Sequence, residues 1–261
     1  MAENLGFDRE MAKRLEVLYA SGDVLRRRRL ARRALGPVPG DRVVDIGCGP
    51  GYYVDEIAVQ VGSGGRVIGV DPSTDMLAVA AEKTARHDNV TLLEGEATSL
   101  PVEDGWADRA LCVQVLEYVD DVPRALAELH RAVRPGGTVV LWDIDWATVS
   151  WHSRNTELMA KVLRVWDDHL AHPSLPRTLA PSMRAAGFDD VRVEGYAFVN
   201  RDAGPNSYTG TVMPLIADFV KGRSGISETE GAAWMDEQLA LSEAGDFFCS
   251  LIQYCFTAIR A

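Results

Sequence analysis

The sequence predicts an α/β fold, in which a mostly parallel sheet is covered by helices on both faces. From residue 42 onward, short runs rich in β-branched residues alternate with stretches of helical apolar spacing, which is typical of parallel strands joined by crossover helices. The short runs are almost wholly apolar, as are strands that are buried on both faces. These two observations predict strands at residues 43–46, 66–70, 90–94, 107–113 and 138–143.

The composition is that of a single globular domain over residues 1–261. The chain is 47% hydrophobic and has a formal charge of −11. An acidic chain repels phosphate backbones, which disfavours a nucleic-acid partner. We find no apolar run near the roughly 18 residues that cross a bilayer, and residues 1–4 lack the basic and apolar regions of a signal peptide. We therefore expect a cytoplasmic protein with no membrane span.

Local signals explain where the helices between the strands begin and end. Residues 71–73, Asp-Pro-Ser, offer a side-chain cap for one helix, and residues 120–123, Asp-Asp-Val-Pro, offer one for another. The Arg-Pro-Gly-Gly run at residues 134–137 should close that second helix before the next strand.

Further helices precede the sheet. Residues 1–40 should form an N-terminal helical segment, with helices at 8–19 and 24–35 and a Ser-Gly-Asp break at 21–23. The arginines within residues 26–33 fan around the second helix, and we interpret this run as a solvated helix.

The second half of the chain completes the core and adds an insertion. Residues 201–245 contain two helical stretches and lie between the core segments 41–200 and 246–261. Such long excursions often cap a site, so we expect a helical cap insertion. The same surface could instead form the contact of a homodimer. The other core elements are expected as helices at residues 155–170 and 178–186 and as strands at residues 191–199 and 247–258.

The cysteines and histidines do not indicate a metal site. The cysteines are too widely spaced for a CxxC pair. His169 and His172 flank an expected helix end without metal-ligand partners. We predict no metal ion, and we expect small buried side chains at Cys48, Cys112, Cys249 and Cys255.

A glycine-rich turn follows the first expected strand. It reads Gly47-Cys48-Gly49-Pro50-Gly51, and residues 52–61 then have helical spacing. Glycines let the backbone turn sharply and approach a ligand, and a helix start offers unpaired amides. The GxGxG spacing differs from the GxGxxG of dinucleotide binders, which favours a ligand without a phosphate. A purely structural tight turn is the alternative.

Asp71 strengthens the interpretation of this turn as a nucleoside site. It ends the second expected strand, about 20 residues after the turn, where a carboxylate can accept hydrogen bonds from both hydroxyls of a ribose. The turn and Asp71 together predict a bound nucleoside.

With these motifs in order, the sequence resembles the class I S-adenosylmethionine-dependent methyltransferases. The matching stretches are residues 43–51, 67–73, 95–101, 116–120 and 134–137. The chain is most similar to the small-molecule enzymes of ubiquinone and menaquinone biosynthesis. The resemblance implies a Rossmann-like, seven-stranded, mostly parallel sheet with an antiparallel last strand, and S-adenosyl-L-methionine as the cofactor.

The resemblance also implies a set of cofactor-binding residues. The glycine turn would lie beneath the methionine and ribose, Asp71 would bind the ribose, and Tyr19 would close over the cofactor. Glu96 stands where relatives more often have aspartate. The full set is Tyr19, Asp45, Gly47, Gly49, Gly51, Asp71, Pro72, Met76, Glu96, Ala97, Gln114 and Val115.

The acceptor side should follow the fifth expected strand, where open α/β sheets form their crevice. Asp143 and Asp145 could orient an acceptor, and His152 could act as a general base. The plain alternatives are carboxylates that cap backbone amides and a hydrogen-bonded loop histidine. The candidate acceptor-binding residues are Trp146, Trp151, Tyr208 and Met213.

Two other functions could use the same motifs. A nicotinamide-dependent oxidoreductase would also need the glycine turn and Asp71, but none of the lysines follows a tyrosine by four residues, as a YxxxK pair requires. An S-adenosylmethionine-binding enzyme of non-methylating chemistry, such as a cyclisation, is the other alternative. We predict methyl transfer to an oxygen, nitrogen or carbon nucleophile of a mostly apolar small molecule, in secondary or quinone-like metabolism.

Overall fold

The computed structural model describes residues 9–261, without the side chain of residue 12. The stretch at residues 1–4, on which the prediction of no signal peptide depends, lies outside the described residues. The helix expected at residues 8–19 is present in the described part as α1 (Arg9–Ala20). No helix within residues 9–261 is long and apolar enough to cross a membrane.

One seven-stranded sheet organises the described part of the chain, in the order β3-β2-β1-β4-β5-β7-β6. Strands β1 to β5 are parallel, whereas β7 is antiparallel to both of its neighbours, β5 and β6. The predicted Rossmann-like sheet with an antiparallel last strand is confirmed. The strands are β1 (Arg42–Ile46), β2 (Arg66–Asp71), β3 (Val90–Glu94), β4 (Ala107–Val113), β5 (Val133–Trp151), β6 (Phe188–Asn200) and β7 (Cys249–Arg260).

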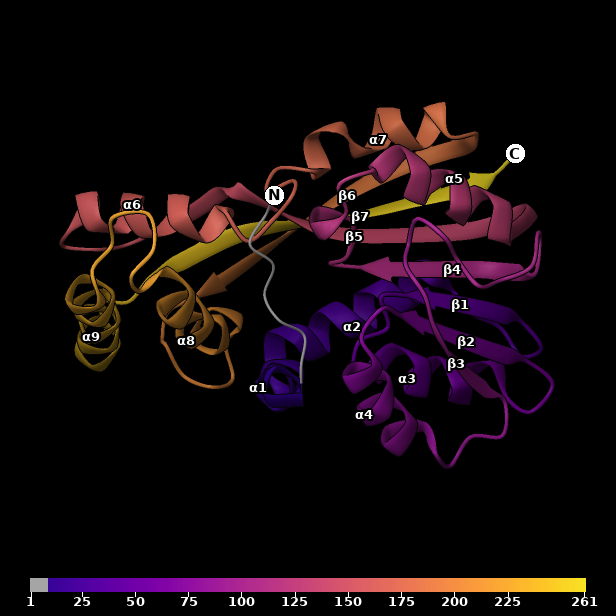
Figure 1. Ribbon diagram of the computed structural model, residues 1–261, viewed down its shortest axis with the longest axis horizontal. Coiled ribbons are helices and arrows are strands. Elements are labelled where there is room, and N and C mark those ends of the chain that lie inside the picture. Colours follow the sequence, from indigo (N-terminus) through magenta and orange to yellow (C-terminus); the bar gives the residue numbers. More distant parts are fainter. Residues whose placement is uncertain (1–8) are drawn as a thin grey trace.

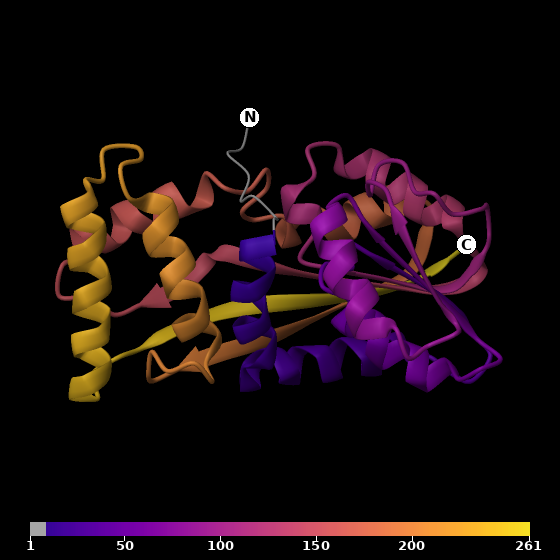
Figure 2. The same cartoon turned by 60° about the horizontal axis from the view of Figure 1, so that its bottom comes forward.

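Helices cover both faces of this sheet (Figure 1). α5 and α7 lie on one face, and α2, α3 and α4 lie on the other. Figure 2 shows α9, α8, α1 and α4 side by side. The cap insertion therefore extends the layer of helices to which α4 belongs. The remaining helices are α2 (Gly22–Leu35), α3 (Tyr52–Val61), α4 (Thr74–Thr84), η1 (Leu116–Tyr118), α5 (Val122–Ala132), α6 (Thr156–Asp167), α7 (Pro176–Ala185), α8 (Tyr208–Val220) and α9 (Glu228–Ala244).

Apolar side chains fill the space between helices and sheet on each face. Val43 belongs to the layer under α2 and α3, and its neighbour Val44 belongs to the layer under α5 and α7. Successive residues of a strand point to opposite faces, so a strand covered on both faces must be apolar throughout. This explains why the apolar runs located the strands. The four cysteines are free and buried, as predicted.

The fifth strand is much longer than predicted. Residues 138–143 were expected, but β5 spans Val133–Trp151 and pairs with β7 along most of that length. Residues 134–137, expected to close α5, already belong to the strand. The expectation that Trp146 and Trp151 follow the strand is therefore wrong, because both lie within it.

A bulge lets β5 continue past its acidic residues. The pairing with β7 shifts between Asp145 and Ser150. There the Thr148 hydroxyl donates to the Asp145 carbonyl at 2.7 Å and accepts from the Ile252 amide at 2.9 Å. The side chain thus replaces lost ladder hydrogen bonds, and the bulge redirects the strand where it passes the cavity described below.

The cap insertion is fixed at the start of α8. This helix begins at Tyr208, where the Ser207 hydroxyl caps it by accepting from the Gly210 amide at 3.0 Å. Asp23, in the first turn of α2, accepts from the Tyr208 amide at 2.9 Å. α8 is therefore joined to α2 by a hydrogen bond between segments far apart in the sequence.

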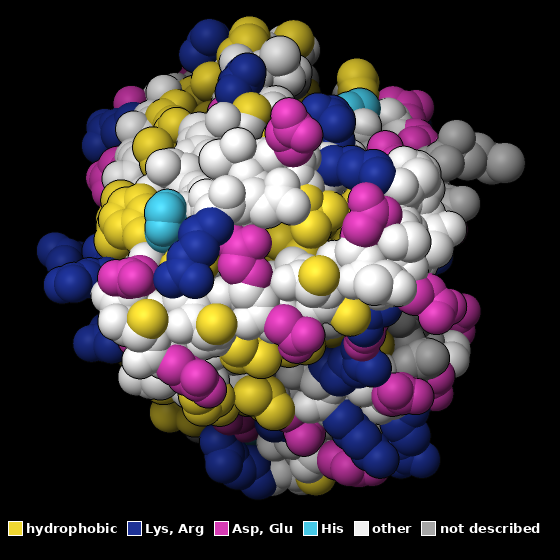
Figure 3. Space-filling model, turned by 90° about the vertical axis from the view of Figure 1, so that its left-hand side faces the viewer, with side chains coloured by type: hydrophobic (Ala, Val, Ile, Leu, Met, Phe, Trp, Pro, Cys, Tyr) yellow, Lys and Arg dark blue, Asp and Glu magenta, His cyan; other side chains and the backbone are white. Residues whose placement is uncertain are grey.

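Helices α6 and α9 form one end of the molecule. The surface of this end carries side chains of several kinds. Acidic and basic side chains are interspersed there with hydrophobic ones (Figure 3). A phosphate backbone is bound by a stripe of positive charge, which this face does not offer. The predicted absence of a nucleic-acid partner stays a prediction for the whole surface.

Candidate functional site

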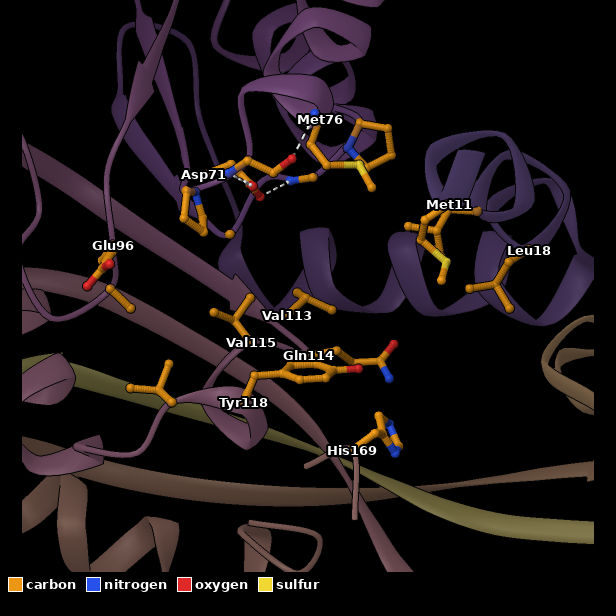
Figure 4. Close-up of a pocket in the computed structure, with 18 of the residues that line it drawn as sticks. Met11, Leu18, Asp71, Met76, Glu96, Val113, Gln114, Val115, Tyr118 and His169 are labelled. Atoms are coloured by element: carbon orange, nitrogen blue, oxygen red, sulfur yellow. Dashed lines mark hydrogen bonds between the residues drawn. The ribbon is translucent and has the colours of Figure 1, made fainter. Parts of the chain in front are cut away.

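A cavity of about 670 Å³ opens at the carboxyl ends of the parallel strands. Its floor comes from the segments that follow β1, β2, β3 and β4, and side chains of α1, α2 and α8 close it from the other side (Figure 4). Open α/β sheets bind ligands at this edge. The cavity therefore lies where the sequence predicts a site.

The glycine turn forms part of the cavity wall. Gly47 and Gly49 line the cavity with φ of +66° and +51°. A Cβ atom at Gly47 would lie 2.2 Å from Cγ2 of Val115, and one at Gly51 would lie 2.8 Å from Cβ of Ala80. Gly47 thus lets β4 approach the turn, and Gly51 lets α4 approach α3 from behind the cavity.

Asp71 enters the cavity from the end of β2 (Figure 4). Its Oδ2 accepts from the Gly49 amide at 2.8 Å, and its Oδ1 accepts from the Ser73 amide at 2.9 Å. Burial raises the pKa of Asp71, and these two hydrogen bonds oppose that rise. Each carboxylate oxygen keeps a second lone pair, so Asp71 can still accept from two hydroxyl groups.

The rest of the predicted cofactor set lies on both sides of Asp71. Met76 is buried and faces the cavity beside Asp71, whereas Glu96 is exposed and accepts from the Thr98 hydroxyl at 3.3 Å. Gln114, at the end of β4, has a φ of +54°, a strained value for a residue other than glycine. The members of the set that line the cavity are Tyr19, Gly47, Gly49, Asp71, Pro72, Met76, Glu96, Ala97, Gln114 and Val115.

Tyr19 covers the glycine turn from α1. Its ring stacks on that of Tyr52, with 4.7 Å between the centroids, and its hydroxyl lies 4.0 Å from the position of a Cβ on Gly49. The side chain also lines the cavity. α1 therefore sits as a cover over the turn.

Arg27 places a buried positive charge at the cavity. Its side chain lines the cavity from α2 and is 1% exposed. Its Nε and Nη1 find no hydrogen-bond partner among the described residues. Its electrostatic neighbours are the phenols of Tyr53, Tyr19 and Tyr208, of which Tyr53 also hydrogen-bonds to it, and the buried carboxyl groups of Glu117 and Asp143. Buried donors without partners are costly, so an anion in the cavity could accept from these two nitrogens.

The prediction of a solvated arginine helix is wrong for Arg27 and Arg28. Arg27 shares a helix face with Val24, Ala31 and Leu35, which are all buried. Arg28 is also buried and pairs with Glu56 at 3.2 Å. The spacing of Arg27 from its apolar neighbours, at three, four and eight residues, is the signal that could have identified its orientation.

The end of the cavity away from Asp71 is aromatic. Trp146 and Trp166 meet edge to face at 5.8 Å, and the His169 ring lies 3.8 Å from that of Trp166. Burial lowers the pKa of His169 to about 4, so its imidazole is neutral at pH 7. Tyr118 and Tyr208 line the same end. This region could hold a flat apolar ligand.

Two buried carboxyl groups lie behind this aromatic end. Glu117 and Asp143 are each 1% exposed, and neither lines the cavity. Burial raises the pKa of Glu117 to about 7 and raises that of Asp143 well above its ordinary value. The proximity of Glu117 raises the pKa of Asp143 further. Burial and the neighbouring carboxyl group therefore both favour the neutral form of Asp143.

The structure does not bring the other predicted catalytic residues into the cavity. Asp145 is buried on the α7 side of the sheet, where its Oδ2 accepts from Nε of Arg177 at 2.7 Å. His152 is exposed beyond the end of β5. Neither residue is among those that line the cavity.

Four other predicted residues lie behind the cavity or away from it. Trp151 packs edge to face on Trp234 at 5.6 Å, and Met213 is fully buried in α8 without lining the cavity. Asp45 is buried in β1, and Gly51 is the last residue of the glycine turn; neither lines the cavity. Of the four predicted acceptor residues, Trp146 and Tyr208 line the cavity.

Several lining residues were not singled out from the sequence as site residues. They include Arg27, Trp166 and His169. Trp166 and His169 are three residues apart at a helix end, a spacing that brings them to the same side of the chain but does not say what they face. The apolar members are Met11, Leu15, Leu18, Pro50, Val113, Val119, Val212 and Leu215. Within residues 9–261, no group of His, Cys, Asp or Glu could hold a metal ion.

Sequence comparison identifies proteins that are similar to this chain. Residues 44–141 match the family described as a methyltransferase domain. The chain is 36% identical over 228 residues to an uncharacterized 37.1 kDa protein in transposon TN4556 of Streptomyces fradiae, covering 86% of this chain and 64% of that protein. It is 37% identical over 122 residues to demethylmenaquinone methyltransferase of Staphylococcus aureus strain MRSA252, covering 47% of this chain and 51% of that enzyme. The chain thus spans less than two thirds of the length of either relative.

A solved structure has the same fold. It is phosphoethanolamine N-methyltransferase 2 of Haemonchus contortus in complex with phosphomonomethylethanolamine and S-adenosylhomocysteine. Its TM-score is 0.63 at 18% sequence identity, and the match covers 98% of this chain and 60% of that one. At this level of identity the likeness shows the fold alone.

Proposed function

This chain carries a class I S-adenosylmethionine-dependent methyltransferase domain, and from that premise we propose that it transfers the methyl group of S-adenosylmethionine to a small-molecule acceptor. The observation that carries the proposal is the pair of Asp71 and Arg27 in one cavity. Asp71 has lone pairs for the hydroxyls of a ribose, and the buried guanidinium of Arg27 has two donors available for an anion such as an amino-acid carboxylate.

The other lining residues fit the remaining parts of this cofactor. Pro72 and Met76 offer an apolar edge to an adenine ring beside Asp71, and Glu96 and Ala97 would meet the adenine at the rim. The glycine turn leaves room for the ribose and the methionine chain because no Cβ occupies it. Tyr19 of α1 would cover the bound molecule.

The reaction does not require a nucleophilic side chain of the protein. When bound, S-adenosylmethionine supplies a methyl carbon that is already activated by a sulfonium. The chain's part is to hold the acceptor in line with that carbon and to exclude water. The aromatic end of the cavity, formed by Trp146, Trp166 and Tyr118, supports a small and mostly apolar acceptor. The name of the demethylmenaquinone methyltransferase relative supports the same class.

A nicotinamide cofactor fits less well. Sheets that bind dinucleotides have all strands parallel in the order 3-2-1-4-5-6. Here the antiparallel β7 lies between β5 and β6. The proposal therefore favours the sulfonium nucleoside over a dinucleotide.

Titration calorimetry of the purified chain tests the proposal. We expect saturable binding of S-adenosylmethionine and S-adenosylhomocysteine and no heat with NADH. Asp71→Ala should weaken binding about 100-fold, because two hydrogen bonds to a charged acceptor are lost. Asp75→Ala, which changes an exposed carboxylate on α4, is the matched control and should bind as the wild type does.

Release of S-adenosylhomocysteine with a panel of quinols, phenols and amines then tests the transfer itself. Binding without release for any acceptor would favour the non-methylating alternative, such as a cyclisation. Binding of NADH in place of S-adenosylmethionine would overturn the proposal.

A further inference from the structure

His169 is a buried histidine that the cofactor does not need. It lies in the turn after α6, is 1% exposed, and lines the cavity. Figure 4 shows it beyond Gln114 and Tyr118, on the side away from Asp71. A ligand that reaches His169 is therefore the acceptor rather than the nucleoside.

The hydrogen bonding of His169 defines which nitrogen faces a ligand. Its Nδ1 is bonded to the carbonyl oxygen of Trp166, and since a carbonyl can only accept, Nδ1 carries the proton. The ring is neutral because burial lowers its pKa to about 4. Nε2 is then an acceptor, and it has no hydrogen-bond partner in the described part of the chain. A donor from a ligand would satisfy it.

Aromatic rings hold His169 in place and shape the space beside it. Trp166 lies against the ring at 3.8 Å, Tyr118 meets it edge to face at 5.9 Å, and Trp146 does so at 6.2 Å. Phe219 completes the packing at 5.7 Å. Flat walls of this kind favour a planar ring system.

The charges of the cavity limit the acceptor further. Arg27, the one lysine or arginine among the described lining residues, is assigned to the carboxylate of the cofactor, and Asp71 to its ribose. The other charged lining residues, Glu96, Asp120 and Asp121, are exposed at the rim. A cationic acceptor would be repelled by the sulfonium, and an anionic one would find no lysine or arginine side chain of the described lining beside His169.

From these observations we infer that the acceptor is an uncharged planar aromatic compound with a hydroxyl group, a phenol or an aromatic enol, whose hydroxyl donates to Nε2 of His169. This inference rests on the proposed function. As the acceptor oxygen forms its bond to the methyl carbon, the carbon–sulfur bond breaks and its electron pair stays on sulfur. Once the oxygen is bonded to the methyl carbon its proton is strongly acidic, so it passes to Nε2 even though burial lowers the pKa of His169 to about 4, and the resulting imidazolium then gives the proton up to solvent.

Ligand binding tests this without relying on turnover. In the presence of S-adenosylhomocysteine, the probes are 1-naphthol, 1-methoxynaphthalene, which cannot donate, and 1-naphthoate, which is anionic. We expect the wild type to bind 1-naphthol about 10-fold more tightly than 1-methoxynaphthalene, as one hydrogen bond implies, and to bind 1-naphthoate least. His169→Ala should abolish the preference for 1-naphthol, and His169→Gln, which keeps an acceptor, should retain part of it.

Turnover and spectroscopy separate hydrogen bonding from proton transfer. His169→Gln should lower methylation of 1-naphthol at least about 100-fold while retaining its binding, since an amide cannot take the proton. In ¹⁵N NMR of the wild type, Nε2 of His169 should be unprotonated at pH 7 and should shift on addition of 1-naphthol. His87→Ala, in the loop between α4 and β3, is the control and should match the wild type.

The outcomes distinguish this inference from the proposed function. If the wild type binds no S-adenosylmethionine, the proposed function fails. If it binds S-adenosylmethionine and methylates an amine or an aliphatic acceptor while His169→Ala is unaffected, only the present inference fails. Equal binding of 1-naphthol and 1-methoxynaphthalene by the wild type, or no binding of either, would also overturn it.

Discussion

Arg27 is the residue whose state depends most on a ligand. Its guanidinium is buried, and two of its nitrogens lack partners among residues 9–261. The guanidinium is partly compensated by Tyr53 and by the charges of Glu117 and Asp143, but two buried donors without partners still cost free energy, which an anionic ligand would offset. Arg27 is therefore expected to strengthen ligand binding and to lower the stability of the unliganded fold.

Replacing Arg27 should separate these two effects. We expect Arg27→Met to weaken S-adenosylmethionine binding by about 10-fold to 100-fold, because charge-assisted hydrogen bonds are lost. The unfolding free energy of the free protein should stay the same or rise by about 1–4 kcal/mol, since a buried charge is replaced by an apolar side chain of similar size. Calorimetry and urea unfolding measure the two quantities.

Arg28→Met is the matched control for this experiment. Arg28 is buried on the same helix, but it pairs with Glu56 at 3.2 Å and does not line the cavity. The control should lose some stability and bind S-adenosylmethionine normally. A wild-type affinity in Arg27→Met would remove Arg27 from the site.

Sequence reasoning predicted some lining residues and missed others for a physical reason. Gly47, Gly49 and Asp71 stand in a local motif, where the chemistry depends on neighbours along the chain. Arg27 and His169 become lining residues only when helices from distant segments pack around the cavity. Periodicity gives the apolar face of a helix, but it does not say whether a polar group on that face meets a partner or a ligand.

At the scale of elements, β5 and its partner β7 form a ribbon that extends beyond the other parallel strands (Figure 1). The cap helices α8 and α9 and helix α6 gather around that extension. The sequence did not predict its length, because Asp143 and Asp145 interrupt the apolar run that marks a buried strand. Both carboxyl groups are buried, which periodicity alone does not anticipate.

We expect the hydrogen bond between α8 and α2 to hold α8 in place over the cavity. Asp23→Ala removes the acceptor of the Tyr208 amide, at 2.9 Å, and of the Asn200 side-chain amide, at 2.6 Å. We expect hydrogen exchange at residues 208–211 to become about 10-fold faster, because a hydrogen bond to a charged acceptor stabilises by about 1.5–3 kcal/mol. Exchange in α5, on the opposite face of the sheet, should not change.

Asp236→Ala serves as the control for Asp23→Ala, since Asp236 is an exposed residue of α9. Its exchange pattern should equal that of the wild type. Unchanged protection of residues 208–211 in Asp23→Ala would mean that packing alone holds α8 in place.

At the scale of the whole molecule, the order of the sheet explains the position of the site. β1 and β4 are neighbours, and their connections leave on opposite faces, so a crevice opens between their carboxyl ends. This arrangement was predictable, because alternating apolar runs and the glycine turn determine it. The aromatic end of the cavity was not predictable, because residues of β5, α6 and α8 form it together.

The stability of the whole fold should depend on pH through His169. Burial lowers its pKa in the folded state to about 4 from an ordinary value of 6.5. The unfolded chain therefore binds the proton more tightly between these values, so this contribution is complete above pH 6.5 and is lost as the pH falls toward 4. Glu117 acts in the opposite direction, because burial raises its pKa to about 7 and its neutral form is favoured in the folded state.

Comparison with His169→Gln isolates the histidine, since Glu117 is present in both proteins. The unfolding free energy of the wild type relative to the variant should fall by about 3 kcal/mol between pH 7 and pH 4. Urea unfolding at several pH values measures this difference. Parallel pH profiles for the two proteins would show that His169 is not held neutral by burial.

A crystal structure of the chain grown with S-adenosylhomocysteine tests the central claim most directly. We expect the ribose hydroxyls within hydrogen-bond distance of the Asp71 carboxylate and the amino-acid carboxylate on the guanidinium of Arg27. The sulfur should then face the aromatic end of the cavity. Density for the nucleoside outside this cavity, or a guanidinium of Arg27 that still lacks an anion, would contradict the assignment of the site.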